Sequence, residues 1–174
     1  LPNVPGFLKQ AGAIESVAAH AWGTAFLCLT FADAAGVEAG EALAIAVVHD
    51  LAEVETGDVP ALLDEAARPV PPAAKAALER AAMQHLASLA PRRLTARALE
   101  AWDTYEDRAS RAAVFVRDMN LVDMALQAWV YEEEHELPPG ELDEFFASAE
   151  RRLTLPLACE LLDEVLAARA RPRP

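Results

Sequence analysis

Residues 44–52 read Ala44-Ile45-Ala46-Val47-Val48-His49-Asp50-Leu51-Ala52, an apolar run that contains a His-Asp pair. Burial of a carboxylate costs several kcal/mol unless the group is paired or binds a metal, and a buried imidazole also needs a partner. Adjacent positions of a helix diverge by about 100°, so we expect groups outside this helix to meet His49 and Asp50. His20, on the preceding predicted helix, is the expected companion of the pair.

The periodicity of the apolar residues indicates the fold class. Apolar residues recur at spacings of three and four along the chain, and the alternation typical of strands is nearly absent. We therefore predict an all-α protein, a single-domain helical bundle that comprises residues 1–174. Helices are expected at residues 15–35, 40–55, 73–90, 95–108, 111–136, 139–152 and 156–169, with a short segment at 59–66.

The composition excludes some classes of function. The chain of 174 residues is 53% hydrophobic and 25% charged, as in a globular protein. Its net charge of -13 argues against binding to a nucleic-acid polymer or an anionic membrane, because phosphates need clustered Lys and Arg. No apolar run approaches the about 20 residues that cross a membrane. Cys28 and Cys159 are interpreted as buried thiols of a cytoplasmic protein, with a disulfide between them as the alternative.

The candidate chemistry is metal binding beside two further carboxylates. His20, His49 and Asp50 offer two imidazoles and one carboxylate, a ligand set that suits Mn, Fe, Co, Ni or Zn. Glu53 follows His49 by one helical turn, and Asp58 lies where the helix is expected to end. Beside a metal, these carboxylates are suited to orient and deprotonate a water. The alternatives are a core histidine at His20, a solvated Glu53 and an Asp58 that bonds to a turn amide.

Three stretches follow one another in the order His…HDxxE…GD and a late helical segment. They are Glu15-Ser16-Val17-Ala18-Ala19-His20, then Ala46-Val47-Val48-His49-Asp50-Leu51-Ala52-Glu53 with Thr56-Gly57-Asp58-Val59-Pro60, then Trp102 and Tyr105-Glu106 with residues 115–128. In this order they resemble the HD-domain phosphohydrolases, above all the subgroup that acts as 5′-deoxynucleotidases on nucleoside monophosphates. The resemblance covers about residues 6–134, and the C-terminal helices at about 139–169 follow it.

This resemblance implies one divalent metal, held by His20, His49, Asp50 and Asn120. The family has Asp at the last of these positions. An amide oxygen can ligate a metal but brings no charge, so we expect Asn120 to weaken the site. Asp123, three residues further along the predicted helix, is a candidate replacement.

The resemblance also assigns the remaining site residues. It implies that Glu53 and Asp58 position the attacking water and the leaving sugar oxygen. Substrate contacts are expected at Phe7, Lys9 and Asp123, with Lys9 as the nearby cation for a phosphate.

Two substitutions depart from the family pattern beside the first histidine. The family has an acidic residue directly before this histidine and an arginine three residues after it. This chain has Ala19 and Gly23 at these positions. The substrate is therefore less well defined by the sequence than the metal site.

We accordingly predict a metal-dependent phosphohydrolase that releases phosphate from a small phosphomonoester, a (deoxy)nucleoside 5′-monophosphate. Its cofactor is expected to be one ion of Mn, Co, Fe, Ni or Zn, with Mg as a further candidate. The alternative is a catalytically weakened HD-domain protein that binds a nucleotide or a protein partner. The family implies a homodimer.

An apolar patch for a dimer interface is expected near Phe145, Phe146 and Leu153. Trp22, Trp102 and Trp129 are expected in the core, with the lining of a nucleobase pocket as the alternative.

Overall fold

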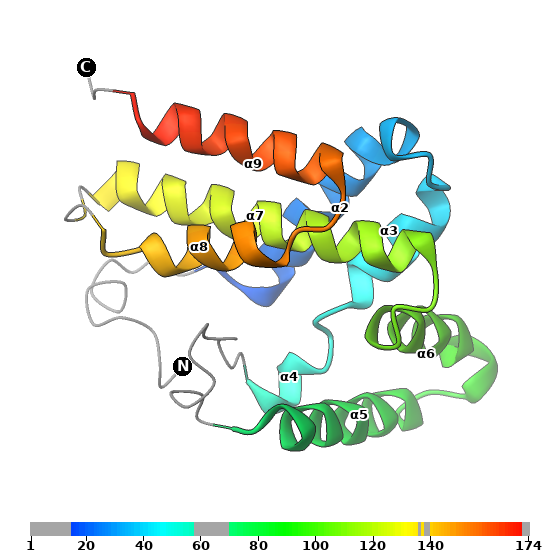
Figure 1. Ribbon diagram of the computed structural model, residues 1–174. Coiled ribbons are helices and arrows are strands. Elements are labelled where there is room, and N and C mark those ends of the chain that lie inside the picture. The colour runs from blue at the N-terminus through cyan, green and yellow to red at the C-terminus, as the bar shows by residue number, and fades with distance from the viewer. Residues whose placement is uncertain (1–14, 58–69, 136, 138–139, 172–174) are drawn as a thin grey trace.

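The computed structural model describes residues 15–57, 70–135, 137 and 140–171, and every regular element within them is a helix (Figure 1). The all-α prediction is therefore confirmed for this part of the chain. The helices are α2 (Val17–Ala35), α3 (Ala39–Val48), α4 (Glu53–Thr56), α5 (Pro72–Ser88), α6 (Arg92–Glu106), α7 (Arg111–His135), α8 (Asp143–Arg152) and α9 (Pro156–Arg169). The predicted segment at 59–66 and the site candidates Phe7, Lys9 and Asp58 lie outside the described residues.

Helix α2 begins and ends at residues with clear capping chemistry. Ser16 precedes it, and its hydroxyl accepts a hydrogen bond from the N–H of Ala19 at 3.1 Å. Gly36 ends the helix with φ 65°, a left-handed conformation that glycine adopts without steric cost. This helix thereby holds His20 in its first turn.

The predicted continuous helix over residues 40–55 is wrong. Helix α3 ends at Val48, residues 49–52 form a turn, and α4 begins at Glu53. In this turn the N–H of Leu51 bonds to the carbonyl of Val48, and the N–H of Glu53 to that of Asp50, three residues back rather than four. The helical register expected between His49 and Glu53 is therefore absent.

A side chain contributes to this break. His49 Nδ1 lies 2.8 Å from the carbonyl oxygen of Ala46, to which it donates a hydrogen bond. In a continuing helix this carbonyl would accept the N–H of Asp50. The imidazole competes with the backbone for the carbonyl, and apolar periodicity does not report such a competition.

Helix α7 is central in the packing. It contacts α2, α3, α6, α8 and α9. In Figure 1, α9 and α8 flank α7, and α4, α5 and α6 lie below them. Phe115, Val116 and Met119 on α7 are fully buried together with Ile45 on α3. Burial of each such side chain contributes about 1.5–3 kcal/mol, so this core fixes α2 and α3, which carry the histidines, against α7.

The start of α9 is anchored to α7 by a buried carboxylate. Asp118 is 1% exposed and accepts hydrogen bonds from the N–H of Leu155 at 2.7 Å and the N–H of Thr154 at 3.0 Å. These backbone groups lie at the N-terminal end of α9, where the helix leaves N–H groups without partners. Asp118 therefore has a structural role.

Two predictions about aromatic residues are wrong. Trp22 is 71% exposed, because it lies on the face of α2 that points away from α3 and α7, whereas Trp102 is 2% exposed as predicted. The apolar patch expected near Phe145, Phe146 and Leu153 is mostly packed inside the protein. Phe146 is 3% exposed, and Phe145 and Leu153 are partly buried against the same second hydrophobic cluster between α7, α8 and α9.

The cysteines are both free thiols, and they differ in burial. Cys28 is buried and Cys159 is exposed, so the prediction holds for the first residue alone. Burial raises the pKa of Cys28 to about 12. The cytoplasmic location inferred from the thiols stays a prediction. Among the described helices, none combines the length and apolar character that crossing a bilayer requires.

Candidate metal centre

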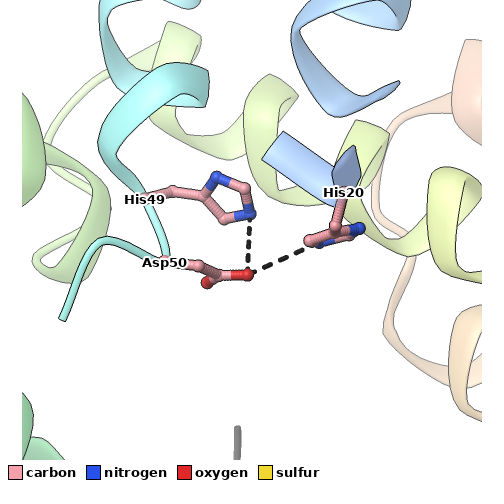
Figure 2. Close-up of side chains that lie close together, drawn as sticks. All are labelled: His20, His49 and Asp50. Atoms are coloured by element: carbon pink, nitrogen blue, oxygen red, sulfur yellow. Dashed lines mark ion pairs between the residues drawn. The ribbon is translucent and has the colours of Figure 1, made fainter. Parts of the chain in front are cut away.

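Three side chains from two parts of the chain meet at one point (Figure 2). His20 comes from α2, and His49 and Asp50 come from the turn after α3. Asp50 Oδ2 lies 3.2 Å from His49 Nε2 and 3.5 Å from His20 Nε2. One ligand atom from each residue lies within 4.8 Å of the others. The structure thus brings together three of the four ligands that the resemblance implies.

The orientation of the His49 ring makes this arrangement suited to a cation. Its Nδ1 donates to Ala46, so in the neutral ring Nε2 carries a lone pair. This Nε2 is buried and has no hydrogen-bond partner among the described residues. It faces a carboxylate oxygen of Asp50, so two acceptors oppose each other at 3.2 Å. A divalent ion satisfies both atoms at once, and the donor set of nitrogen and oxygen fits a transition metal.

Asp123 approaches His20 from the other edge of the ring. Its Oδ2 lies 2.8 Å from His20 Nδ1. Asp123 and Glu15 form a second group with His20 in which the candidate ligand atoms are mutually close. Among the described residues, the two groups share only His20. Asp123 therefore lies beyond His20 as seen from Asp50.

The carboxylates around His20 favour its charged form. Burial lowers the pKa of His20, but the hydrogen bond to Asp123 and the charges of Asp50 and Asp123 outweigh it and raise this pKa to about 9. Burial likewise raises the pKa of Asp50, but the positive charges around it, those of His20 and Lys75 among them, outweigh burial, so the pKa of Asp50 is lowered. Without a metal, the centre therefore holds an imidazolium beside an ionised carboxylate.

Asn120 is connected to the centre through a tyrosine. Its Nδ2 donates a hydrogen bond to Tyr105 Oη at 2.9 Å. The Tyr105 ring meets the His49 ring edge-on, with centroids 5.3 Å apart. Burial and the charge of Asp50 both raise the pKa of Tyr105, so the phenol stays neutral. The sequence did not indicate that Tyr105 lies between Asn120 and His49. Its place in the late motif was the one sign that it belongs near the site.

Lys75 on α5, which the sequence did not indicate as a site residue, brings a positive charge close to the centre. Its Nζ lies 2.9 Å from Glu79 Oε1 and 3.8 Å from Glu53 Oε1. Burial lowers the pKa of Lys75, but Glu79, Glu53 and Asp50 outweigh it, so the pKa is raised. The spacing of Lys75 and Glu79 is that of an ordinary surface pair. Nothing in the sequence indicated that α5 folds back onto α4.

Comparison with known proteins agrees with this fold and site. The family model described as HD domain matches residues 6–157. The 5′-deoxynucleotidase HDDC2 of Danio rerio is 34% identical over 157 residues, which cover 90% of this chain and 75% of the relative. The Homo sapiens protein of the same name is 31% identical over 157 residues, 90% of this chain and 73% of the relative.

Solved structures agree as well. The PH0347 protein from Pyrococcus horikoshii OT3 is 28% identical, with a TM-score of 0.66 over 95% of this chain and 88% of its own. A structure called a predicted metal-dependent phosphohydrolase, from Magnetospirillum magnetotacticum MS-1, is 24% identical with a TM-score of 0.62 over 94% of this chain and 84% of its own, and supports the fold alone. The resemblance found in the motifs is thus confirmed, and the chain belongs to the HD domain family.

Proposed function

We propose that this protein is a metal-dependent phosphohydrolase that releases phosphate from a (deoxy)nucleoside 5′-monophosphate. The observation that carries the proposal is the meeting of His20, His49 and Asp50 around the buried His49 Nε2, which has no hydrogen-bond partner among the described residues. The relatives named 5′-deoxynucleotidase support the substrate class. They also favour the hydrolase over a protein that only binds nucleotides.

In this proposal, His20 Nε2, His49 Nε2 and the Asp50 carboxylate hold one divalent ion, and Asn120 completes the set. Two imidazoles favour Mn, Co, Fe, Ni or Zn over Mg, which prefers oxygen ligands. When bound, such an ion polarises the phosphoryl oxygen and lowers the pKa of a coordinated water.

The acid–base work is assigned to Glu53, with Asp58 at the leaving oxygen. Glu53 accepts the proton of the attacking water, and Lys75, 3.8 Å away, orients its carboxylate. The Lys75 ammonium also offsets part of the negative charge that a phosphate meets near Asp50. Phe7 and Lys9 stay the predicted substrate contacts. The carboxylate of Asp123, predicted as a third, bonds to His20 on the side away from Asp50, so we do not assign it to the substrate.

The decisive experiment combines elemental analysis of the purified protein with phosphate release from a panel of deoxynucleoside monophosphates, assayed with Mn, Co and Mg. We expect about one metal per chain and release that depends on it. Asp50→Ala should lose both, whereas Asp33→Ala, an exposed carboxylate on α2, should lose neither. Metal without release from any nucleotide would overturn the substrate class, and absence of metal would overturn the whole proposal.

We further propose that the protein forms a homodimer through the exposed side of α2. Three exposed apolar side chains lie on one face of this helix: Trp22 is 71% exposed, Phe26 54% and Leu29 58%. The rings of Trp22 and Phe26 are stacked, with their centroids 5.7 Å apart. Exposed apolar stripes of this kind often mark interfaces. Light scattering should give twice the chain mass, and Phe26→Gln should shift it toward the monomer. Leu89→Gln, 71% exposed elsewhere, is the control and should not.

A further inference from the structure

Asp123 makes a direct contact with a candidate metal ligand. Its Oδ2 lies 2.8 Å from His20 Nδ1, and the two side chains are 12% and 17% exposed. The contact joins α7 to α2 and uses the ring nitrogen that points away from Asp50. The other nitrogen, Nε2, lies 3.5 Å from Asp50 Oδ2. A rotation of the ring would break the first contact and remove Nε2 from the centre.

The chain leaves room for this carboxylate at Gly23. A Cβ atom at Gly23 would lie 3.0 Å from Asp123 Cγ and 3.1 Å from its Oδ2, and closer still to its Oδ1. Glycine within a helix is unfavourable compared with alanine. Its presence at this position is explained by the carboxylate that lies against it. An arginine here, as the family pattern has it, is incompatible with Asp123 in this position.

We propose that Asp123 is a positioning residue that holds His20 for the metal, and that Gly23 provides the space it needs. The inference rests on the proposed metal centre. Metal-binding histidines commonly donate their second N–H to a carboxylate, which fixes the tautomer and orientation and makes the ring a stronger ligand. Asp123 also places a negative charge near the centre. It lies on α7 with Asn120, whose amide side chain carries no charge.

The structure offers one competing interpretation, in which Glu15, His20 and Asp123 themselves bind an ion. The 2.8 Å separation of His20 Nδ1 and Asp123 Oδ2 is that of a direct hydrogen bond, with a proton between the two atoms. The geometry therefore favours the positioning role.

The test measures Mn and Co affinity by titration, together with the His20 Nδ1–H proton by NMR in the metal-free protein. A strong hydrogen bond to a carboxylate moves this proton downfield and slows its exchange, and its loss in His20→Gln assigns it. Asp123→Ala should weaken metal binding by about 10–100-fold and abolish the signal, with helix content unchanged. Asp123→Asn, of nearly equal size, should retain the fold and part of the affinity, because its amide oxygen still accepts the hydrogen bond.

Gly23→Ala supplies an independent arm of the test. It should weaken metal binding in the parent chain, because the new methyl group displaces Asp123. In the Asp123→Ala background the same substitution should have no further effect, since the space is then free. Equal losses in both backgrounds would overturn the role given to Gly23.

The outcomes separate this inference from the proposed function. If the parent chain binds metal and Asp123→Ala and Asp123→Asn bind it equally well, the inference fails and the metal centre stands. If the parent chain binds none, the proposed function fails, and the Nδ1–H signal alone decides whether Asp123 holds His20. Loss of a second equivalent of metal in Asp123→Ala would overturn the positioning role in favour of an ion site.

Discussion

His49 and Asp50 are neighbours in the chain, and Nε2 of the first lies 3.2 Å from Oδ2 of the second. In a continuous helix, adjacent side chains diverge by about 100°. The two groups meet at the end of α3, where residues 49–52 form a turn. The centre therefore lies at the end of this helix, and His20 completes it from α2.

Asn120→Asp should strengthen metal binding. A carboxylate adds a charge that the amide lacks, and Tyr105 can still donate its O–H to it, so we expect about a tenfold higher affinity. Metal titration checks this, and phosphate release should rise in parallel. Tyr105→Phe in the same background controls for an effect that acts through the phenol. Unchanged affinity would show that residue 120 does not ligate the ion.

Metal binding should release protons, with a defined pH dependence. The pKa of His20, raised from 6.5 to about 9, means that its ring is protonated at neutral pH without metal. Metal affinity should therefore increase as pH rises from about 6.5 to 9. Calorimetric titration in buffers with different ionisation enthalpies reports the number of protons released. An affinity independent of pH over this range would contradict the assignment.

The stability of the metal-free protein should fall as pH rises, whereas metal affinity should increase. Because the pKa of His20 is raised in the folded state, its protonated ring stabilises the fold fully below pH 6.5. This contribution is lost as pH rises through about 9. The shift corresponds to a loss on the order of 3 kcal/mol. Urea unfolding of metal-free protein at both pH values measures it. The same loss in His20→Gln would assign the effect to other groups.

Lys75→Met should lower the turnover number by at least about tenfold while metal content stays the same. The substitution keeps the apolar stem but removes the charge beside Glu53, so the carboxylate loses the group that orients it. Lys75→Arg retains a cation and should recover part of the rate. Turnover by Lys75→Met at the parent rate would exclude this role.

Asp118→Ala should lower the free energy of unfolding by about 2–3 kcal/mol, since the N–H groups of Thr154 and Leu155 lose a buried charged acceptor. Metal affinity of the folded protein should be unchanged, because Asp118 contacts α9 and not the centre. Urea unfolding checks the first expectation. Asp163→Ala, an exposed carboxylate on α9, is the matched control.

The sequence alone was sufficient to predict the helical class, most helix bounds and the three residues that the fold brings together, His20, His49 and Asp50. Helices α7 and α9 begin where they were expected, at Arg111 and Pro156, because Gly, Pro and polar residues interrupt a regular apolar period. The His…HDxxE…GD order identified the family, because metal chemistry restricts which residue types occur at these spacings. Both signals are local in the chain.

Only the tertiary structure decided how these residues meet. A hydrogen bond from His49 to Ala46 accompanies the turn at residues 49–52, and apolar periodicity carries no information on it. Lys75 reaches Glu53, and Asp123 reaches His20 over the bare backbone of Gly23, because helices far apart in sequence pack together. Such contacts depend on side-chain volume and packing across the core. The sequence determined which groups are present, and the fold determined which of them touch.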